Sequence, residues 1–292
     1  MPDGAQKVYG GYTADELAKH YNPAPLVPDL PAYQQWNAEE SKRVAARVKH
    51  ERDIAYGEAP IQKLDIYPAA KSGAPVLIDL HGGGWIAGSK NARAYPAEAV
   101  VGRGVTWAPI DYGLAPTFKM DAIVDHVRQA VAWVYKNISR YGGDPNRIFV
   151  SGNSAGGHLT ATTVMAGWHA KYGVPEDVVK GACAMSGAYD LNPLRLASHG
   201  PNEQLQMDEA EATRNSPISH ILKSKRPMIV GYGAPETEGF KSQGVNYVKA
   251  LKEAGIPVTE IVVPGAHHYA MSREIMNRDS EIHNAIMKMI GV

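Results

Sequence analysis

Residues 147–159 read RIFVSGNSAGGHL, and this stretch decides the fold. The run at 147–150 predicts a strand, whereas residues 155–170 carry a helical pattern. Between them Gly152, Ser154 and Gly156 form the pattern Gly-x-Ser-x-Gly. In so tight a turn, side chains two positions before or after the serine would collide with the backbone, so glycines are needed and the serine projects outward. The stretch therefore predicts Ser154 as a nucleophile at the end of a strand.

A glycine-rich turn without chemistry is the competing interpretation of this stretch. The five-residue pattern alone occurs by chance in many proteins, but the strand before it and the helix after it favour a reactive serine. The helix also directs its N-terminus at the serine, which favours negative charge there.

Short β-branched runs alternate with longer helical patterns over much of the chain. The runs that predict strands are at 64–67, 76–80, 105–110, 147–150, 178–185, 227–231 and 258–263, and helical patterns fall at 121–138, 155–170, 239–254 and 272–290. Such alternation builds a mostly parallel sheet with helices on both faces, which is the α/β class. Ligands of open α/β sheets bind at the carboxyl ends of the strands, so chemistry is expected in the loops that follow them.

Two segments fall outside this alternation. Residues 22–31 contain four prolines and predict an extended arm, which a helix over 32–50 follows. The polar region 191–222 shows no clear strand and predicts a helical insertion above the sheet. We expect one domain, residues 1–292, with an N-terminal arm and helix at 1–50 and a cap-like insertion at 191–222.

Composition excludes several classes of partner. Thirty basic residues balance thirty acidic ones without a long basic run, so nucleic acid is not an expected partner. No apolar stretch reaches the roughly 20 residues that cross a bilayer, and the first five residues lack the pattern of a secretory signal. The single cysteine, Cys183, forms no intramolecular disulfide, which fits a reducing compartment. We expect a cytoplasmic protein without membrane association.

A second glycine cluster, His81-Gly82-Gly83-Gly84-Trp85, directly follows the predicted strand at 76–80. Consecutive glycines let backbone N–H groups turn towards a negatively charged oxygen, as acyl transfer requires. The amides of Gly83, Gly84 and Ala155 are the candidate oxyanion-hole donors. A phosphate-binding loop is the alternative, but neither Gly-x-Gly-x-x-Gly nor a following Gly-Lys-Ser/Thr is present.

These motifs resemble the hormone-sensitive-lipase-like branch of the α/β-hydrolases. The segments that carry the resemblance are HGGGW at 81–85, YGLAP at 112–116 and GNSAGG at 152–157. Further segments are similar to the serine-dependent arylformamidases, or kynurenine formamidases: YNP at 21–23, MDAIV at 120–124, SGAYDLNPL at 186–194 and PETEGF at 235–240. The resemblance covers most of residues 20–290. It implies an α/β-hydrolase fold with a small helical cap, and a homodimer as a possible assembly.

The resemblance also implies an acid and a base, which follow the nucleophile along the chain in that order. The family's Gly-x-x-His spacing selects His268 over the adjacent His267 as the base. The acid is expected at Glu236, four residues before Phe240, with Glu238 as the alternative or as a charge at a helix N-terminus. The remaining histidines, His158 among them, are interpreted as ordinary polar residues.

The resemblance implies hydrolysis of an N-formyl amide or small ester through an acyl-enzyme, with a small molecule as the partner. His268 would take the Ser154 proton and Glu236 would stabilise the imidazolium, so the scheme needs no metal and no cofactor. Trp85, Tyr112 and Tyr189 are expected to line the substrate pocket, or else to be ordinary core residues. A general short-chain carboxylesterase and a catalytically inactive ligand-binding protein on the same fold are the alternatives. The arm and the insertion are expected to govern substrate choice.

Overall fold

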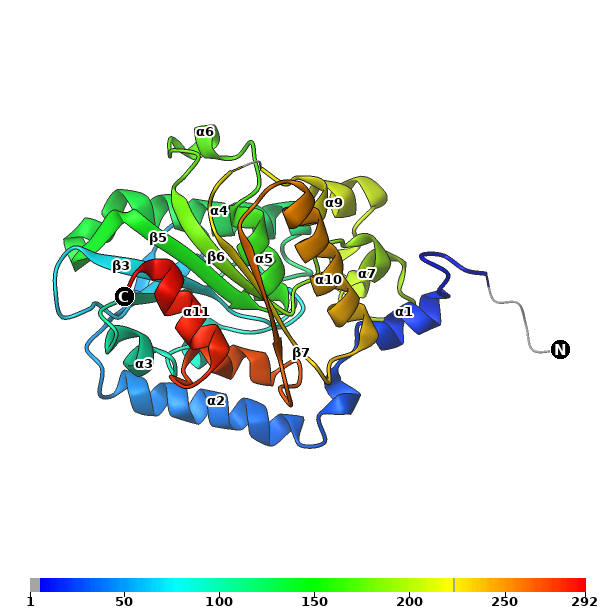
Figure 1. Cartoon of the computed structure of the whole chain (residues 1–292), viewed down its shortest axis with the longest axis horizontal. Coiled ribbons are helices and arrows are strands. Elements are labelled where there is room, and N and C mark those ends of the chain that lie inside the picture. Colours follow the sequence, from blue (N-terminus) through cyan, green and yellow to red (C-terminus); the bar gives the residue numbers. More distant parts are fainter. Residues whose placement is uncertain (1–5, 223) are drawn as a thin grey trace.

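The centre of the molecule is an eight-stranded β-sheet in the computed structural model, which describes residues 6–222 and 224–292 (Figure 1). The strands are β1 Glu51–Ala55, β2 Lys63–Ile66, β3 Ala74–Leu80, β4 Thr106–Ile110, β5 Gly143–Asn153, β6 Val179–Met185, β7 Met228–Gly233 and β8 Val258–Val263. Their order is β1-β2-β4-β3-β5-β6-β7-β8. The pairs β1–β2 and β2–β4 are antiparallel and the other neighbours are parallel, which confirms the predicted sheet. The first five residues, on which the secretory-signal argument rested, lie outside the described range.

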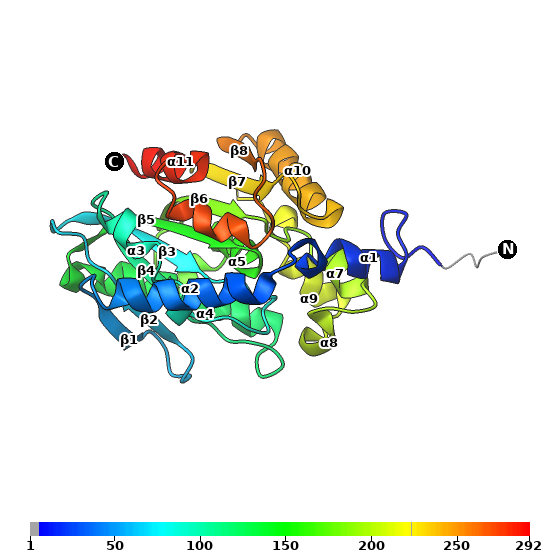
Figure 2. The same cartoon turned by 90° about the horizontal axis from the view of Figure 1, so that it is seen from below.

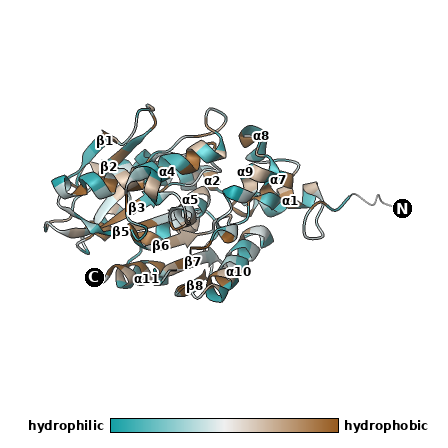
Figure 3. Cartoon of the chain, turned by 90° about the horizontal axis from the view of Figure 1, so that it is seen from above, coloured by the Kyte–Doolittle hydropathy of each residue, from teal (hydrophilic) through white to brown (hydrophobic). Residues whose placement is uncertain are grey.

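Helices cover both faces of this sheet. One face carries α4 Met120–Asn137, α5 Ala155–Thr163 and α10 Glu238–Glu253, and the other carries α2 Leu30–Ala45, α3 Ala97–Val101 and α11 Glu281–Ile290 (Figures 1 and 2). Successive strand side chains point to opposite faces. Val76 and Ile78 accordingly pack in the core beneath α4 and α5, while Leu77 packs beneath α3 and α11. The inner strand β3 is therefore apolar on both faces apart from the buried Asp79, and most of it is brown in Figure 3.

The strand β1 was not predicted. It is an edge strand whose residues Glu51, Arg52, Asp53 and Ala55 are exposed, with Ile54 half-buried. A strand that buries one side chain carries almost no period-two signal, so its sequence does not distinguish it from a loop.

Residues 22–31 contradict the expectation of an extended arm, because they contain a 3₁₀ turn, η1 Ala24–Leu26, and the start of α2. A helix that was not predicted, α1 Ala14–His20, precedes them. Pro25 and Pro31 occupy the first turns of η1 and α2. Proline fits a first helical turn because its missing N–H would have no partner there. Pro25 and Pro31 therefore begin helical segments and do not keep the chain extended.

The insertion between β6 and β7 consists of short helices. They are α7 Asn192–Leu196, α8 Asn202–Leu205, α9 Glu209–Arg214 and the 3₁₀ turn η4 Pro217–Ser219. Figure 2 shows these helices beside α1 at one end of the molecule. The backbone amide of Ser198 donates to the Ala14 carbonyl oxygen, which joins the N-terminal segment to the insertion. In the part of the chain that the structure describes, no helix is long and apolar enough to cross a membrane.

Two predicted helices are shorter in the structure. α5 ends at Thr163, and α6 His169–Tyr172 follows a break that contains Gly167. The pattern at 272–290 divides into a 3₁₀ segment, η5 Ala270–Ile275, and α11. Ser280 caps α11 by accepting a hydrogen bond from the His283 amide, so the helix begins there.

Candidate active site

Ser154 occupies a strained turn between β5 and α5. Its φ of 60° lies in the left-handed region, which non-glycine residues rarely adopt. A Cβ on Gly152 would lie 2.4 Å from the Gly156 carbonyl oxygen, and one on Gly156 would lie 1.9 Å from the Leu80 carbonyl oxygen. Both positions therefore require glycine, as the sequence pattern indicated.

Ser154, His268 and Glu236 form a continuous chain of hydrogen bonds, which we call the triad. His268 Nε2 lies 2.8 Å from Ser154 Oγ, and His268 Nδ1 lies 2.7 Å from Glu236 Oε2. Glu236 comes from the loop after β7 and His268 from the loop after β8, so all three side chains meet at the carboxyl ends of the strands. Both partners of the serine are almost completely buried. The Glu236 carboxylate accepts from Nδ1, which directs the free Nε2 lone pair to the serine hydroxyl.

The alternative residues for the base and the acid lie elsewhere. The His267 ring packs edge-on against Tyr33, and its Nδ1 accepts from the Ala270 amide at 3.1 Å. Glu238 is the first residue of α10 and forms an exposed ion pair with Lys241 at 3.0 Å. Neither residue contacts Ser154 in the described hydrogen-bond network. The acid and the base that are hydrogen-bonded to the serine in sequence are Glu236 and His268.

Two further residues hold the triad, and the sequence analysis did not find them. The Ser186 hydroxyl donates to Glu236 Oε1 at 2.6 Å, beside the Gly233 amide at 2.7 Å. The Asn153 side-chain amide donates to the His268 carbonyl oxygen at 3.1 Å. Ser186 also has a positive φ, of 46°. It directly follows β6, and a serine just after an inner strand is the one signal that pointed to it.

The glycine turn, residues 82–85, packs directly against the serine. A Cβ on Gly82 would lie 3.0 Å from the Asn153 carbonyl oxygen and 3.3 Å from Ser154 Cβ. Gly83 and Gly84 have φ values of 121° and 61°. Within the described residues, the backbone amides of Gly83, Gly84 and Ala155 have no hydrogen-bond acceptor, and all three residues line the cavity beside Ser154. These amides are thus available to a negatively charged oxygen formed next to the serine.

A cavity of about 780 Å³ opens above the triad. Its walls include Asp15, Lys19 and Tyr21 of the N-terminal segment, and Leu194 and Pro201 of the insertion. The two segments that lie outside the regular sheet therefore shape the space above Ser154.

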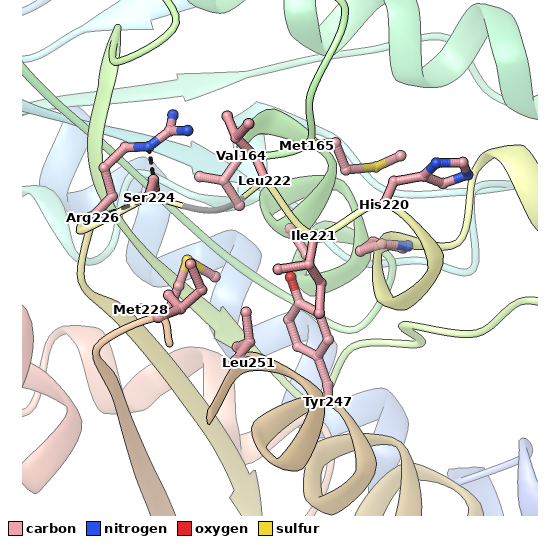
Figure 4. A pocket seen from close by; sticks show the side chains of 13 residues that line it. Val164, Met165, His220, Ile221, Leu222, Ser224, Arg226, Met228, Tyr247 and Leu251 are labelled. Atoms are coloured by element: carbon pink, nitrogen blue, oxygen red, sulfur yellow. Dashed lines mark hydrogen bonds between the residues drawn. The ribbon is translucent and has the colours of Figure 1, made fainter. Parts of the chain in front are cut away.

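A separate hollow between α5 and α10 holds only about 10 Å³, enough for at most one water molecule (Figure 4).

Of the three side chains expected in the pocket, Trp85 lines the cavity, but Tyr112 and Tyr189 are not among the described residues that line it. Both tyrosines are completely buried. Tyr112 stacks on the His81 ring and donates to the His81 carbonyl oxygen, so it holds the residue that precedes the glycine turn. Tyr189 stacks on Tyr247 and donates to the Ala184 carbonyl oxygen. Sequence pattern cannot distinguish an aromatic residue under a site from one that faces it.

The parallel sheet, the serine in its strained turn and the triad together define an α/β-hydrolase. Comparison with known proteins agrees. The BD-FAE family model matches residues 64–247. A kynurenine formamidase of Danio rerio is 31% identical over 95% of this chain and 96% of its own length. Esterase LipQ of Mycobacterium tuberculosis is 29% identical over 86% of this chain and 63% of its own length.

The chain belongs to the BD-FAE family of α/β-hydrolases, in the hormone-sensitive-lipase-like branch and close to the arylformamidases. It is an enzyme of the hydrolase class. A Silicibacter protein of known structure superposes with a TM-score of 0.82 over 95% of this chain and 100% of that chain, at 23% identity, which supports the fold alone.

Proposed function

We propose that this chain is a serine hydrolase that cleaves an N-formyl amide of an aromatic amine through an acyl-enzyme. The observation that carries the proposal is the 2.8 Å contact between His268 Nε2 and Ser154 Oγ on the cavity floor. It places a general base within reach of the hydroxyl proton, and the base in turn is oriented by Glu236.

The first half of the reaction follows from this geometry. His268 Nε2 takes the hydroxyl proton while Ser154 Oγ attacks the formyl carbon, and Glu236 stabilises the imidazolium that forms. The amides of Gly83, Gly84 and Ala155 face the tetrahedral oxygen. As the C–N bond breaks, His268 returns its proton to the amine nitrogen, which leaves as a neutral amine.

Water completes the cycle. It attacks the formyl ester of Ser154 while His268 accepts one of its protons, and as the ester C–O bond breaks His268 returns that proton to Ser154 Oγ. Formic acid leaves and ionises to formate in solution.

The choice of an aromatic formamide rests on the cavity and the relatives. Aromatic side chains of Tyr21, Trp85, Phe240 and Tyr269 line a space far larger than a formyl group needs, which suits a large flat leaving group. A relative over nearly the whole chain is named a kynurenine formamidase. A short-chain carboxylesterase is the second candidate, because the same triad hydrolyses esters and another relative is named an esterase.

A substrate panel separates the two candidates. Wild-type protein is assayed with an N-formyl anilide, p-nitrophenyl acetate and p-nitrophenyl butyrate. We expect formamide turnover, and a loss on the order of 10⁴-fold or more in kcat for Ser154→Ala. Ester turnover without any formamide turnover would favour the carboxylesterase. A fluorophosphonate probe that failed to label Ser154 would refute the catalytic scheme.

A further inference from the structure

His158 is a completely buried histidine that the reaction scheme does not use. It lies on α5, four residues after Ser154, and both ring nitrogens have partners. The Trp85 indole N–H donates to Nδ1 at 3.2 Å, and Nε2 lies 2.8 Å from the Asn215 carbonyl oxygen. An indole only donates and a carbonyl only accepts, so the proton is on Nε2. Burial lowers the pKa of His158 to about 4, and the ring is therefore neutral at neutral pH.

These two hydrogen bonds join three separate parts of the active site. Trp85 belongs to the glycine turn, His158 to the helix that begins at the nucleophile, and Asn215 to the insertion. The Asn215 side chain continues the chain of contacts, because it donates to Asp121 of α4 at 2.7 Å.

The glycine turn needs an external restraint. Gly83, Gly84 and Trp85 are consecutive residues with positive φ, and Trp85, at 59°, has a side chain that disfavours this conformation. Such strain persists only where surrounding structure fixes it. The Trp85 indole is almost completely buried and its ring meets the His158 ring edge-on, with centroids 5.2 Å apart. Its N–H has His158 as its acceptor.

We infer that His158 is a positioning residue that sets the amides of the glycine turn against Ser154 by holding the Trp85 indole. The inference rests on the proposed function, because it assigns the turn to binding the tetrahedral oxygen. In this hydrogen bond the Trp85 indole is the donor and His158 Nδ1 is the acceptor. Each partner can therefore be substituted separately.

The first test removes the donor and leaves His158 intact. Trp85→Phe keeps an aromatic ring but has no N–H. We expect kcat for p-nitrophenyl acetate, normalised to sites titrated with a fluorophosphonate, to fall about 10- to 100-fold, with KM changed less than about threefold. The matched control is Trp168→Phe, which removes a buried indole that donates to the Thr163 carbonyl oxygen and stacks on His169 outside the cavity.

The second test separates the role of His158 Nδ1 from that of Nε2. In His158→Asn the side-chain amide reaches the position of Nδ1 and can accept from Trp85, whereas in His158→Gln it reaches the position of Nε2 and can donate to Asn215. We expect His158→Asn to keep kcat within about threefold and His158→Gln to lose about as much as Trp85→Phe. The double variant Trp85→Phe, His158→Gln should lose no more than either single variant.

The inference is overturned if Trp85→Phe matches Trp168→Phe in normalised kcat, or if the two His158 variants lose kcat equally. It is also overturned if the Trp85 and His158 effects multiply. Each of these results leaves the wild-type activity, and with it the proposed function, standing. Loss of the proposed function would be visible in the wild-type protein itself, as absent turnover and absent labelling.

Discussion

The Glu236 carboxylate is enclosed by protein, and each of its oxygens accepts from a defined donor. Oε1 accepts from Ser186 and Gly233, and Oε2 accepts from His268. A buried carboxylate is costly unless it is hydrogen-bonded, and these donors come from the end of β7, the residue after β6 and the loop after β8. The same contacts that make burial tolerable also fix the carboxylate relative to the imidazole.

Glu236→Gln tests this arrangement at the scale of one atom. The amide group has one acceptor oxygen, so it cannot satisfy the Ser186 and Gly233 donors on one side and the His268 Nδ1 proton on the other. We expect the imidazole to lose its productive tautomer and kcat to fall on the order of 10³- to 10⁴-fold, measured on p-nitrophenyl acetate.

Glu238→Gln is the matched control for this change. Glu238 is exposed and forms an ion pair with Lys241, so kcat of the Glu238→Gln variant should stay within about twofold of wild type. If Glu238→Gln were the inactive variant, the assignment of the acid would be wrong.

Residues differ in how far the sequence alone reveals them. The immediate neighbours of Ser154 predict its role, because local sterics require glycines at 152 and 156. Ser186 and Asn153 act through contacts with residues far along the chain, and the place of Ser186 just after an inner strand is only a weak signal for its role. His158 was interpreted as ordinary because its partners come from two distant loops. A sequence pattern can predict the geometry of a single turn, but it does not predict which distant residues the fold places in contact.

At the scale of elements, α1 begins at a local signal in the sequence. Residues 13–16 read TADE, which fits a capping box. The Thr13 hydroxyl accepts from the Glu16 amide at 3.2 Å, and Glu16 Oε2 accepts from the Thr13 amide at 2.7 Å. These bonds, with Lys7, hold the pKa of Glu16 at about 2, so its carboxylate remains ionised at neutral pH.

Thr13→Ala removes one half of this capping box. Loss of a helix N-cap costs about 1 kcal/mol, which raises local opening of α1 about fivefold. We expect hydrogen exchange of the Leu17 and Tyr21 amides, which bond within this helix and at its end, to accelerate by that factor. Exchange in α11 should not change.

Ser280→Ala supplies the reverse control, because Ser280 caps α11 through the His283 amide. It should accelerate exchange in α11 and leave α1 as it was. Equal acceleration in both helices with either variant would mean that they open only with the whole molecule, contrary to this prediction.

At the scale of the whole molecule, a buried polar network links β3 to the segment after the glycine turn and to the segment after His268. Arg93, which follows the glycine turn, contacts both oxygens of Asp79 on β3, at 2.6 and 2.9 Å. Burial alone would lower the pKa of Arg93, but the Asp79 carboxylate raises it above its ordinary value. Arg93 also bonds Tyr95, whose hydroxyl contacts Ser272 in the segment after His268. The alternation of strands and helices predicts the sheet, but not this polar link across it.

Asp79→Asn should therefore destabilise the entire fold. It leaves Arg93 buried without an opposing charge, and breaking a buried pair in this way costs about 3–5 kcal/mol. Urea unfolding followed by circular dichroism measures the loss.

As a control, Glu98→Gln removes one charge of the exposed Arg47–Glu98 pair and should cost less than about 1 kcal/mol. Replacing both partners, as in Asp79→Leu with Arg93→Met, should cost less than Asp79→Asn alone, because no buried charge then remains. A loss below about 1 kcal/mol for Asp79→Asn would mean that Arg93 finds water or another acceptor, and that the ion pair does not stabilise the fold.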